Sequence, residues 1–270
     1  MTGPTPTPAD GFPHVSVSRE DGTAWITLSN PGRMNALTAA MWAALPGLVR
    51  EADADPAVRV IVLRGEGTTA FSAGADISEF ASARTGEAAA TYDQLNENAF
   101  QSLIKAETPI IAMIHGFCLG GGLGIAACAD IRLADDQSQF AIPPAKLGIG
   151  YNPRWIPPLL ALAKPAQVKE MLFTGRRFKS AGALAMGLVN RVLPADALLA
   201  ETRALAAEIG QNAPLSIRAA KMAIDELTRR PEHPDLRRLD DAVQACFKSQ
   251  DYIEGRQAFL EKRKPQFKGQ

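Results

Sequence analysis

The chain has 270 residues, of which 46% are hydrophobic, so it is long enough to bury a large core. Its 29 basic and 29 acidic side chains give a formal net charge of zero, which counts against a nucleic-acid-binding protein and against a polybasic membrane-surface protein. The three cysteines are odd in number and lack metal-ligand spacing, so a reducing cytoplasm is the expected compartment. Three scattered histidines argue against a histidine-rich metal site.

The neutral total hides an asymmetry along the chain. Residues 1–100 hold 12 acidic and 6 basic side chains, whereas residues 101–270 hold 17 acidic and 23 basic ones. Four of the positive charges, and no negative one, lie within residues 262–268. Such a local cluster is sufficient to attract an anionic ligand even though the whole chain is neutral.

The first half of the chain alternates strand and helix signals. Residues 1–12 are rich in Thr, Pro and Gly and are expected to form a loose leader. Thr38 is placed to cap a helix that ends near residue 52, and the polar, Ala-rich stretch 78–106 is expected to be helical or partly mobile. Strands are predicted at residues 15–18, 25–28, 58–63, 109–114 and 131–134. Strands separated by helices indicate a mostly parallel sheet with crossover helices.

The second half is mainly helical. Helices are predicted at residues 159–163, 166–173, 181–186, 198–209, 214–228 and 239–248, with one strand at 189–192. We therefore expect three parts: the leader at 1–12, an α/β core at 13–195 and a helical region at 196–270. The uncharged stretch 110–129 contains five glycines, which favours a strand, a tight turn and a buried helix over a membrane span.

Two glycine-containing segments, residues 71–76 and 115–124, lie beside predicted strand ends. Small residues let a ligand approach the backbone, and the N–H groups at a helix start carry positive partial charge. Two such N–H groups that converge on one oxygen form an oxyanion hole. On spacing alone, close packing of a helix on a strand explains the glycines equally well.

The order and spacing of several motifs resemble the enoyl-CoA hydratase/isomerase, or crotonase, superfamily. The resemblance covers nearly the whole chain from about Val15. The residues that carry it are Asn30-Pro31, Met34-Asn35-Ala36-Leu37, Phe71-Ser72-Ala73-Gly74-Ala75-Asp76-Ile77, Leu119-Gly120-Gly121-Gly122, Phe173-Thr174-Gly175-Arg176 and the ending from Glu254 to Pro265.

The resemblance implies an α/β fold of the crotonase type, a spiral of ββα turns followed by a C-terminal helical region that mediates trimerisation. It implies a homotrimer or homohexamer and an acyl-CoA substrate, with no metal and no cofactor beyond the coenzyme A moiety. The N–H groups of Ala75 and Gly121 would hold the thioester oxygen of an enolate. The residues implied in coenzyme A binding are Arg33, Ala36, Ala73, Asp76, Ile77, Phe259 and Lys262.

Two positions depart from the hydratase pattern. The hydratases of the superfamily carry glutamates where this chain has Gly124 and Pro144, and neither residue can transfer a proton. The run from Leu147 to Asn152 resembles the methylmalonyl-CoA decarboxylase branch, although that branch has a histidine at position 75 and a glutamate at 124. Decarboxylation needs no general base, so a decarboxylase-like site is expected, with the Tyr151 hydroxyl and Asn152 bound to the substrate carboxylate.

Two alternatives remain open from the sequence. An enoyl-CoA hydratase or isomerase with an atypical acid/base is one, and Glu79, one helical turn after Ala75, is the best carboxylate for that role. A non-catalytic acyl-CoA binder that keeps the oxyanion hole is the other. Tyr151 and Glu79 also have plain structural explanations, as a half-buried aromatic residue and a solvated helix residue.

Overall fold

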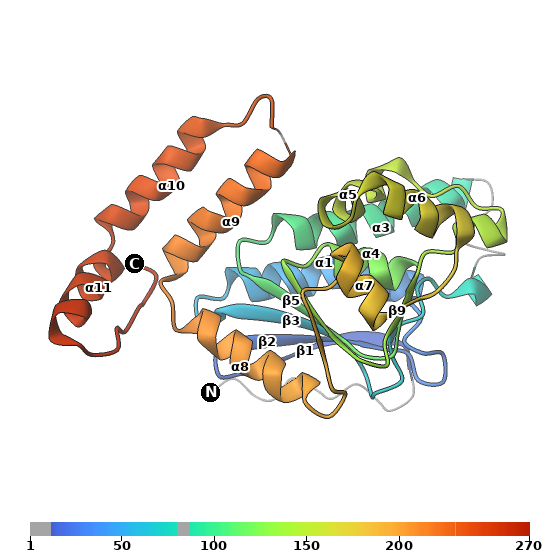
Figure 1. The fold of residues 1–270 in the computed structure, drawn as a ribbon, viewed down its shortest axis with the longest axis horizontal. Coiled ribbons are helices and arrows are strands. Elements are labelled where there is room, and N and C mark those ends of the chain that lie inside the picture. The colour runs from blue at the N-terminus through green and yellow to red at the C-terminus, as the bar shows by residue number, and fades with distance from the viewer. Residues whose placement is uncertain (1–11, 80–86, 230) are drawn as a thin grey trace.

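The computed structural model describes residues 12–79, 87–229 and 231–270 (Figure 1). Of the expected leader at 1–12 only Phe12 is described, and its side chain is exposed. Residues 80–86 of the stretch expected to be helical or partly mobile also lie outside the described residues.

The larger sheet joins strands from both halves of the chain. Its strand order is β1-β2-β3-β5-β7-β10, and every neighbouring pair is parallel except the hairpin of β1 and β2. Asp21 and Gly22 both have positive φ, as a two-residue turn between twisted antiparallel strands requires. The strands are β1 (His14–Glu20), β2 (Thr23–Ser29), β3 (Val60–Gly65), β5 (Ile110–Ile114), β7 (Ile131–Asp135) and β10 (Arg191–Leu193).

Short strands form a second, smaller sheet with the order β4-β6-β8-β9. Along the chain each of β3, β5 and β7 is followed by one strand of this sheet and then by helical structure, so the chain winds as a spiral of ββα turns. This confirms the predicted fold class, although the short strands themselves were not predicted. They are β4 (Ala70–Ser72), β6 (Phe117–Leu119), β8 (Gln139–Ala141) and β9 (Phe178–Lys179).

Both faces of the larger sheet are covered by helices. Successive strand residues face opposite sides, so Ile61 and Leu63 belong to a core with α1, α3 and α4, whereas Val60 and Val62 pack towards α8. The helices of the α/β region are α1 (Ala39–Ala54), α3 (Glu87–Lys105), α4 (Gly121–Ala127), α5 (Pro157–Leu162), α6 (Pro165–Thr174), α7 (Ser180–Met186) and α8 (Leu198–Gly210), with 3-10 helices η1 (Ile77–Glu79), η2 (Pro144–Leu147) and η3 (Pro153–Trp155).

The last three helices form an arm that projects from one end of the sheet (Figure 1). They are α9 (Pro214–Arg229), α10 (Leu236–Lys248) and α11 (Gln250–Glu261). The region predicted at residues 196–270 includes α8, which packs on the sheet, and the arm, which begins at α9. α11 was not predicted, because its mid-helix Gly255 breaks the helical pattern; there the Phe267 ring lies 3.4 Å from an ideal Cβ position.

A short C-terminal segment ties the arm together and to the core. The buried carboxylate of Asp251 accepts hydrogen bonds from the N–H groups of Lys268 and Gly269, each at 2.7 Å. Arg59, which precedes β3, donates to the carbonyl of Phe267 at 2.6 Å. Residues 267–269 therefore link the sheet to α11 through hydrogen bonds at both ends.

A buried carboxylate, Asp76, organises the loop that leads from β2 to α1. It accepts hydrogen bonds from Arg33 at 3.1 Å and from the Ser78 N–H and hydroxyl at 3.0 and 2.7 Å. Asn30 donates to the carbonyl of Ala36 at 2.6 Å and lies 3.5 Å from Asp76. Burial raises the pKa of Asp76, but the Ser78 hydrogen bonds and the Arg33 charge outweigh it, so the net pKa lies below 3.8.

We expect Asp76→Asn to lower the free energy of unfolding at pH 7 by about 1–3 kcal/mol, because the replacement removes a charged acceptor from a buried set of donors. The folded-state pKa is lowered, so this stability is present above about pH 3.8 and is lost as pH falls through the folded pKa. Urea unfolding of both proteins at pH 7 and pH 3 measures this. A difference of the same size at both pH values would contradict the assignment.

Candidate active site

The site begins where the loop after β4 meets the start of α4. An ideal Cβ on Gly74 would lie 2.8 Å from the carbonyl oxygen of Leu119 and 3.1 Å from the nitrogen of Gly121. Gly74 also has a φ of +93°, which L side chains rarely adopt. Only glycine at position 74 therefore lets the two backbone segments come this close.

The close approach brings two peptide N–H groups together. Leu37 donates to the carbonyl of Gly74 and accepts from the N–H of Asp76, so the N–H of Ala75 between them points away from Leu37. Gly121 is the first residue of α4, where an amide has no acceptor within the helix. An ideal Cβ on Gly121 lies 3.7 Å from the nitrogen of Ala75. Both amides can therefore donate to one oxygen atom.

Neighbouring strands hold this pair of amides in place. β4 and β6 pair in parallel, and the Gly120 N–H donates to the carbonyl of Ala141 in β8 at 2.7 Å. The Ser72 hydroxyl donates to the Asn35 carbonyl at 2.8 Å and accepts from the Gly74 N–H at 3.1 Å. The donors are thus fixed before any ligand arrives, which is what electrostatic stabilisation of an oxyanion requires.

Four aromatic rings extend from the oxyanion donors. Trp42 lies 2.8 Å from an ideal Cβ on Gly121, and its Nε1 donates to the Tyr92 hydroxyl at 3.1 Å. Successive edge-to-face contacts link the rings, with centroids 5.6, 5.7 and 5.7 Å apart. We call this set the aromatic wall; in order of contact it comprises Trp42, Phe100, Trp155 and Tyr151. Trp42 borders Gly121 with apolar surface, and the other rings of the wall continue from it.

The structure gives the two decarboxylase-type candidates different surroundings. The Tyr151 hydroxyl is buried and makes no hydrogen bond within the described residues, and burial raises the pKa of this phenol above its ordinary value. The Asn152 side chain accepts from the N–H of Arg154 at 3.0 Å and donates to Asp93 at 3.3 Å. Burial therefore keeps the Tyr151 phenol neutral, whereas Asn152 caps η3 and donates to Asp93.

Glu79 lies at the end of η1, close in sequence to Ala75. Its Oε2 accepts a hydrogen bond from the N–H of Ala39 at 2.7 Å, at the start of α1. A carboxylate at a helix N-terminus is stabilised by the helix dipole, so Glu79 has a structural role in addition to the proposed chemical one. It is half-buried rather than the solvated residue of the structural alternative.

The candidates for coenzyme A binding divide into two groups. Arg33 has a side chain that is 56% exposed, Ala73 donates its N–H to the Met34 carbonyl, and Ala36 is buried beside Asn30. Ile77 is exposed at the start of η1. Ala73 and Ile77 lie two positions from Ala75 in the chain. Arg33 and Ala36 lie on the loop that Asp76 organises.

The second group lies elsewhere. Phe259 is 84% exposed on α11, and Lys262 ends that helix with a φ of +55°. Figure 1 shows α11 at the far end of the arm and α4 within the α/β region, so one chain does not bring these residues to its own oxyanion donors. Phe259 lines an apolar groove of about 940 Å³ between α9, α10 and α11.

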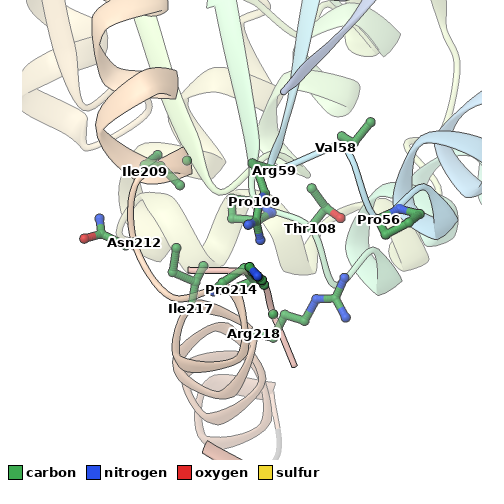
Figure 2. A pocket seen from close by; sticks show the side chains of 13 residues that line it. Pro56, Val58, Arg59, Thr108, Pro109, Ile209, Asn212, Pro214, Ile217 and Arg218 are labelled. Carbon is green, nitrogen blue, oxygen red and sulfur yellow. The ribbon is translucent and has the colours of Figure 1, made fainter. Parts of the chain in front are cut away.

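A smaller cavity of about 120 Å³ lies between the core and the start of α9 (Figure 2). Arg59, Thr108 and Arg218 line it, but Arg59 is bound to Phe267 and Arg218 lies 3.7 Å from Glu107. It opens at the residues that precede β3 and β5, whereas the oxyanion donors follow β4 and β6. Within the described ranges no cluster of His, Cys, Asp or Glu is suited to a metal ion, and no helix is long and apolar enough to span a membrane.

The sequence interpretation missed the aromatic wall apart from Tyr151. Its rings come from α1, α3 and the segment at η3, which are far apart in the chain, so no local spacing connects them. Trp42 shares the helical spacing of Met41 and Leu45, and that spacing predicts only a core residue. Asp93 was also missed, because its partner Asn152 lies far from it in the chain.

Comparison with known proteins supports the arrangement over almost the whole chain. A family model described as enoyl-CoA hydratase/isomerase matches residues 18–270. A solved structure described as an enoyl-CoA hydratase/carnithine racemase from Magnetospirillum magneticum is 38% identical, with a TM-score of 0.91, and covers 95% of this chain and 96% of that one.

Curated relatives are similar over comparable lengths. Crotonyl-CoA hydratase from Syntrophomonas wolfei is 32% identical over 256 residues, which is 95% of this chain and 98% of that protein. Carnitinyl-CoA dehydratase from Citrobacter koseri is 37% identical over 220 residues, or 80% of this chain and 83% of that protein. The family model and these relatives together show that the chain belongs to the enoyl-CoA hydratase/isomerase family.

Proposed function

We propose that the protein binds an acyl-CoA thioester and stabilises its enolate with the N–H groups of Ala75 and Gly121. The convergence of these two amides, enforced by Gly74, is the observation that carries the proposal. Reactions that create negative charge on a thioester oxygen gain several kcal/mol from two preorganised donors in a water-poor site. The aromatic wall supplies that apolar surround. No cofactor is needed beyond the coenzyme A moiety of the substrate.

For the reaction that follows, we propose proton transfer of the hydratase or isomerase type. The curated relatives described above are called hydratase and dehydratase, which favours this reading over the decarboxylase-like one expected from the sequence. Gly124 and Pro144 carry no acid, so another carboxylate must transfer the proton. Glu79 is our candidate, because it lies four residues after Ala75 and its hydrogen bond from Ala39 orients it.

Decarboxylation is the second candidate, and the Tyr151 hydroxyl favours it. This neutral, buried hydroxyl can donate to a substrate carboxylate. When the carbon–carbon bond to the carboxylate breaks, carbon dioxide leaves and the bonding electron pair enters the thioester enolate. A proton then adds to the enolate carbon. A carboxylate-bearing acyl group would thus need the oxyanion donors and Tyr151, but no general base. The methylmalonyl-CoA decarboxylase resemblance stays a hypothesis.

We further propose that the protein assembles as a trimer or a hexamer. Large apolar side chains are exposed on the arm, and monomers rarely leave such a surface uncovered. They include Ile224, Val243, Phe247, Ile253, Phe259 and Leu260. Val243, Phe247, Phe259 and Leu260 line the groove of the arm, so a second copy seated there would cover them. It can also bring Phe259 and Lys262 to the coenzyme A of a neighbouring subunit.

We expect the enzyme to work in the reducing cytoplasm. The thiols of Cys118 and Cys128 are free and buried, and burial raises the pKa of Cys128 to about 12. Neither thiol is therefore a reactive nucleophile or a partner in a disulfide bond.

Gly74→Ala tests the oxyanion hole. The added Cβ would lie 2.8 Å from the Leu119 oxygen at an unfavourable φ, so it should separate the two amides. We expect kcat to fall about 100-fold or more, with a smaller effect on coenzyme A affinity. Gly47→Ala is the control, since no described heavy atom outside its helix lies within 4 Å of that Cβ. Equal kcat values for Gly74→Ala and Gly47→Ala, with both proteins folded by circular dichroism, would sink the assignment.

A substrate panel separates the proposed reactions. Crotonyl-CoA hydration, enoyl-CoA isomerisation and methylmalonyl-CoA decarboxylation are measured for the wild type, Glu79→Gln and Tyr151→Phe. The main proposal expects turnover of an enoyl-CoA that falls at least about 100-fold in Glu79→Gln and little in Tyr151→Phe. Carbon dioxide release that depends on Tyr151 would establish the second candidate instead. Coenzyme A binding without turnover would indicate a non-catalytic acyl-CoA binder.

The combined substitution Val243→Asp and Leu260→Asp tests the assembly. Both side chains are exposed in the groove of the arm, so charges there should not unfold the chain but should break an apolar interface. We expect light scattering to show a trimer or hexamer for the wild type and smaller species for the variant. Leu199→Asp on α8, also at an exposed apolar residue, is the matched control. A monomeric wild type would refute the proposed interface.

A further inference from the structure

One face of α4 carries two glycines, and aromatic rings cover both. Gly121 and Gly124 are three residues apart, so their Cβ directions lie on the same side of the helix. An ideal Cβ on Gly121 meets Trp42 at 2.8 Å, and one on Gly124 meets the tip of the Phe100 ring at 2.8 Å. The space that a side chain at position 124 would need is therefore filled by Phe100.

The Phe100 ring has little freedom to leave this position. It is 3% exposed and contacts Trp42 and Trp155 edge-to-face, with interplanar angles of 82° and 74°. Trp42 is itself held by its hydrogen bond to Tyr92. Each such aromatic contact contributes about 0.5–1.5 kcal/mol beyond its buried area, so the ring is held from two sides.

The position of the ring limits what can extend along α4. Gly121 supplies one oxyanion donor, and Gly124 lies about 4.5 Å further along the helix axis at 1.5 Å per residue. Phe100 therefore lies within about one helical turn of the oxyanion donors, next to Trp42 on the same face of α4. We propose that Phe100 closes the acyl end of the site and restricts the protein to short-chain acyl-CoA thioesters; this rests on the acyl-CoA site proposed above.

Phe100→Ala should open the closed end. Dissociation constants are measured by calorimetry for butyryl-, octanoyl- and dodecanoyl-CoA, which need not react, so the result does not depend on turnover. We expect the wild type to favour butyryl-CoA and the variant to bind the two longer thioesters at least about 10-fold more tightly than the wild type. The control is Leu103→Ala, a fully buried residue one turn further along α3, which should keep the wild-type length preference.

Gly124→Ala provides a second test that does not open a cavity. Its Cβ would push on the Phe100 ring, so we expect weaker butyryl-CoA binding in Gly124→Ala and recovery in the Phe100→Ala, Gly124→Ala double variant. Unchanged length preference in Phe100→Ala, or additive effects in the double variant, would overturn the role of Phe100 while leaving the acyl-CoA site intact. A wild type that binds none of the three thioesters, in a fully folded sample, would overturn both proposals.

Discussion

The contact between Gly74 and the start of α4 is the constraint on which the rest of the site depends. Two backbone segments approach so closely that a Cβ at Gly74 would press on Leu119 and Gly121. The surrounding structure keeps them there: β4 pairs with β6, Leu37 bridges Ala75, and the Ser72 hydroxyl bonds both sides of the loop. Two strands of the smaller sheet, β4 and β6, thus end beside the pair of amides.

The aromatic wall changes what these dipoles can do. Rings in place of charged side chains lower the local dielectric, so a hydrogen bond to a developing oxyanion gains strength. Apart from the Tyr151 hydroxyl, the rings of the wall carry no group that readily exchanges a proton. In the proposed hydratase or isomerase reaction Glu79 at η1 transfers the proton, whereas in the proposed decarboxylation the Tyr151 hydroxyl binds the substrate carboxylate, so the two candidate reactions depend on different residues.

The family resemblance correctly predicted the fold class, and it singled out Ala75 and Gly121, whose backbone segments lie close together in the structure. The glycines near Ala75 and Gly121 are unusual within their segments, and the resemblance placed them in a spiral of ββα turns. The sequence alone could not predict the hydrogen bond from Asn152 to Asp93 or the one from Ala39 to Glu79. These contacts join residues about 60 and 40 positions apart. α11 was missed because Gly255 interrupts its pattern, although Phe267 packs against that glycine.

Phe100 occupies the space that a side chain at position 124 would need, and this limits the order in which the two residues can be substituted. A side chain added at position 124 by one substitution meets the Phe100 ring, so it strains the protein unless the ring moves. Loss of the ring alone leaves a hole in the core and costs about 3–5 kcal/mol. Either single change therefore gives a less stable protein, so the two positions are expected to change together.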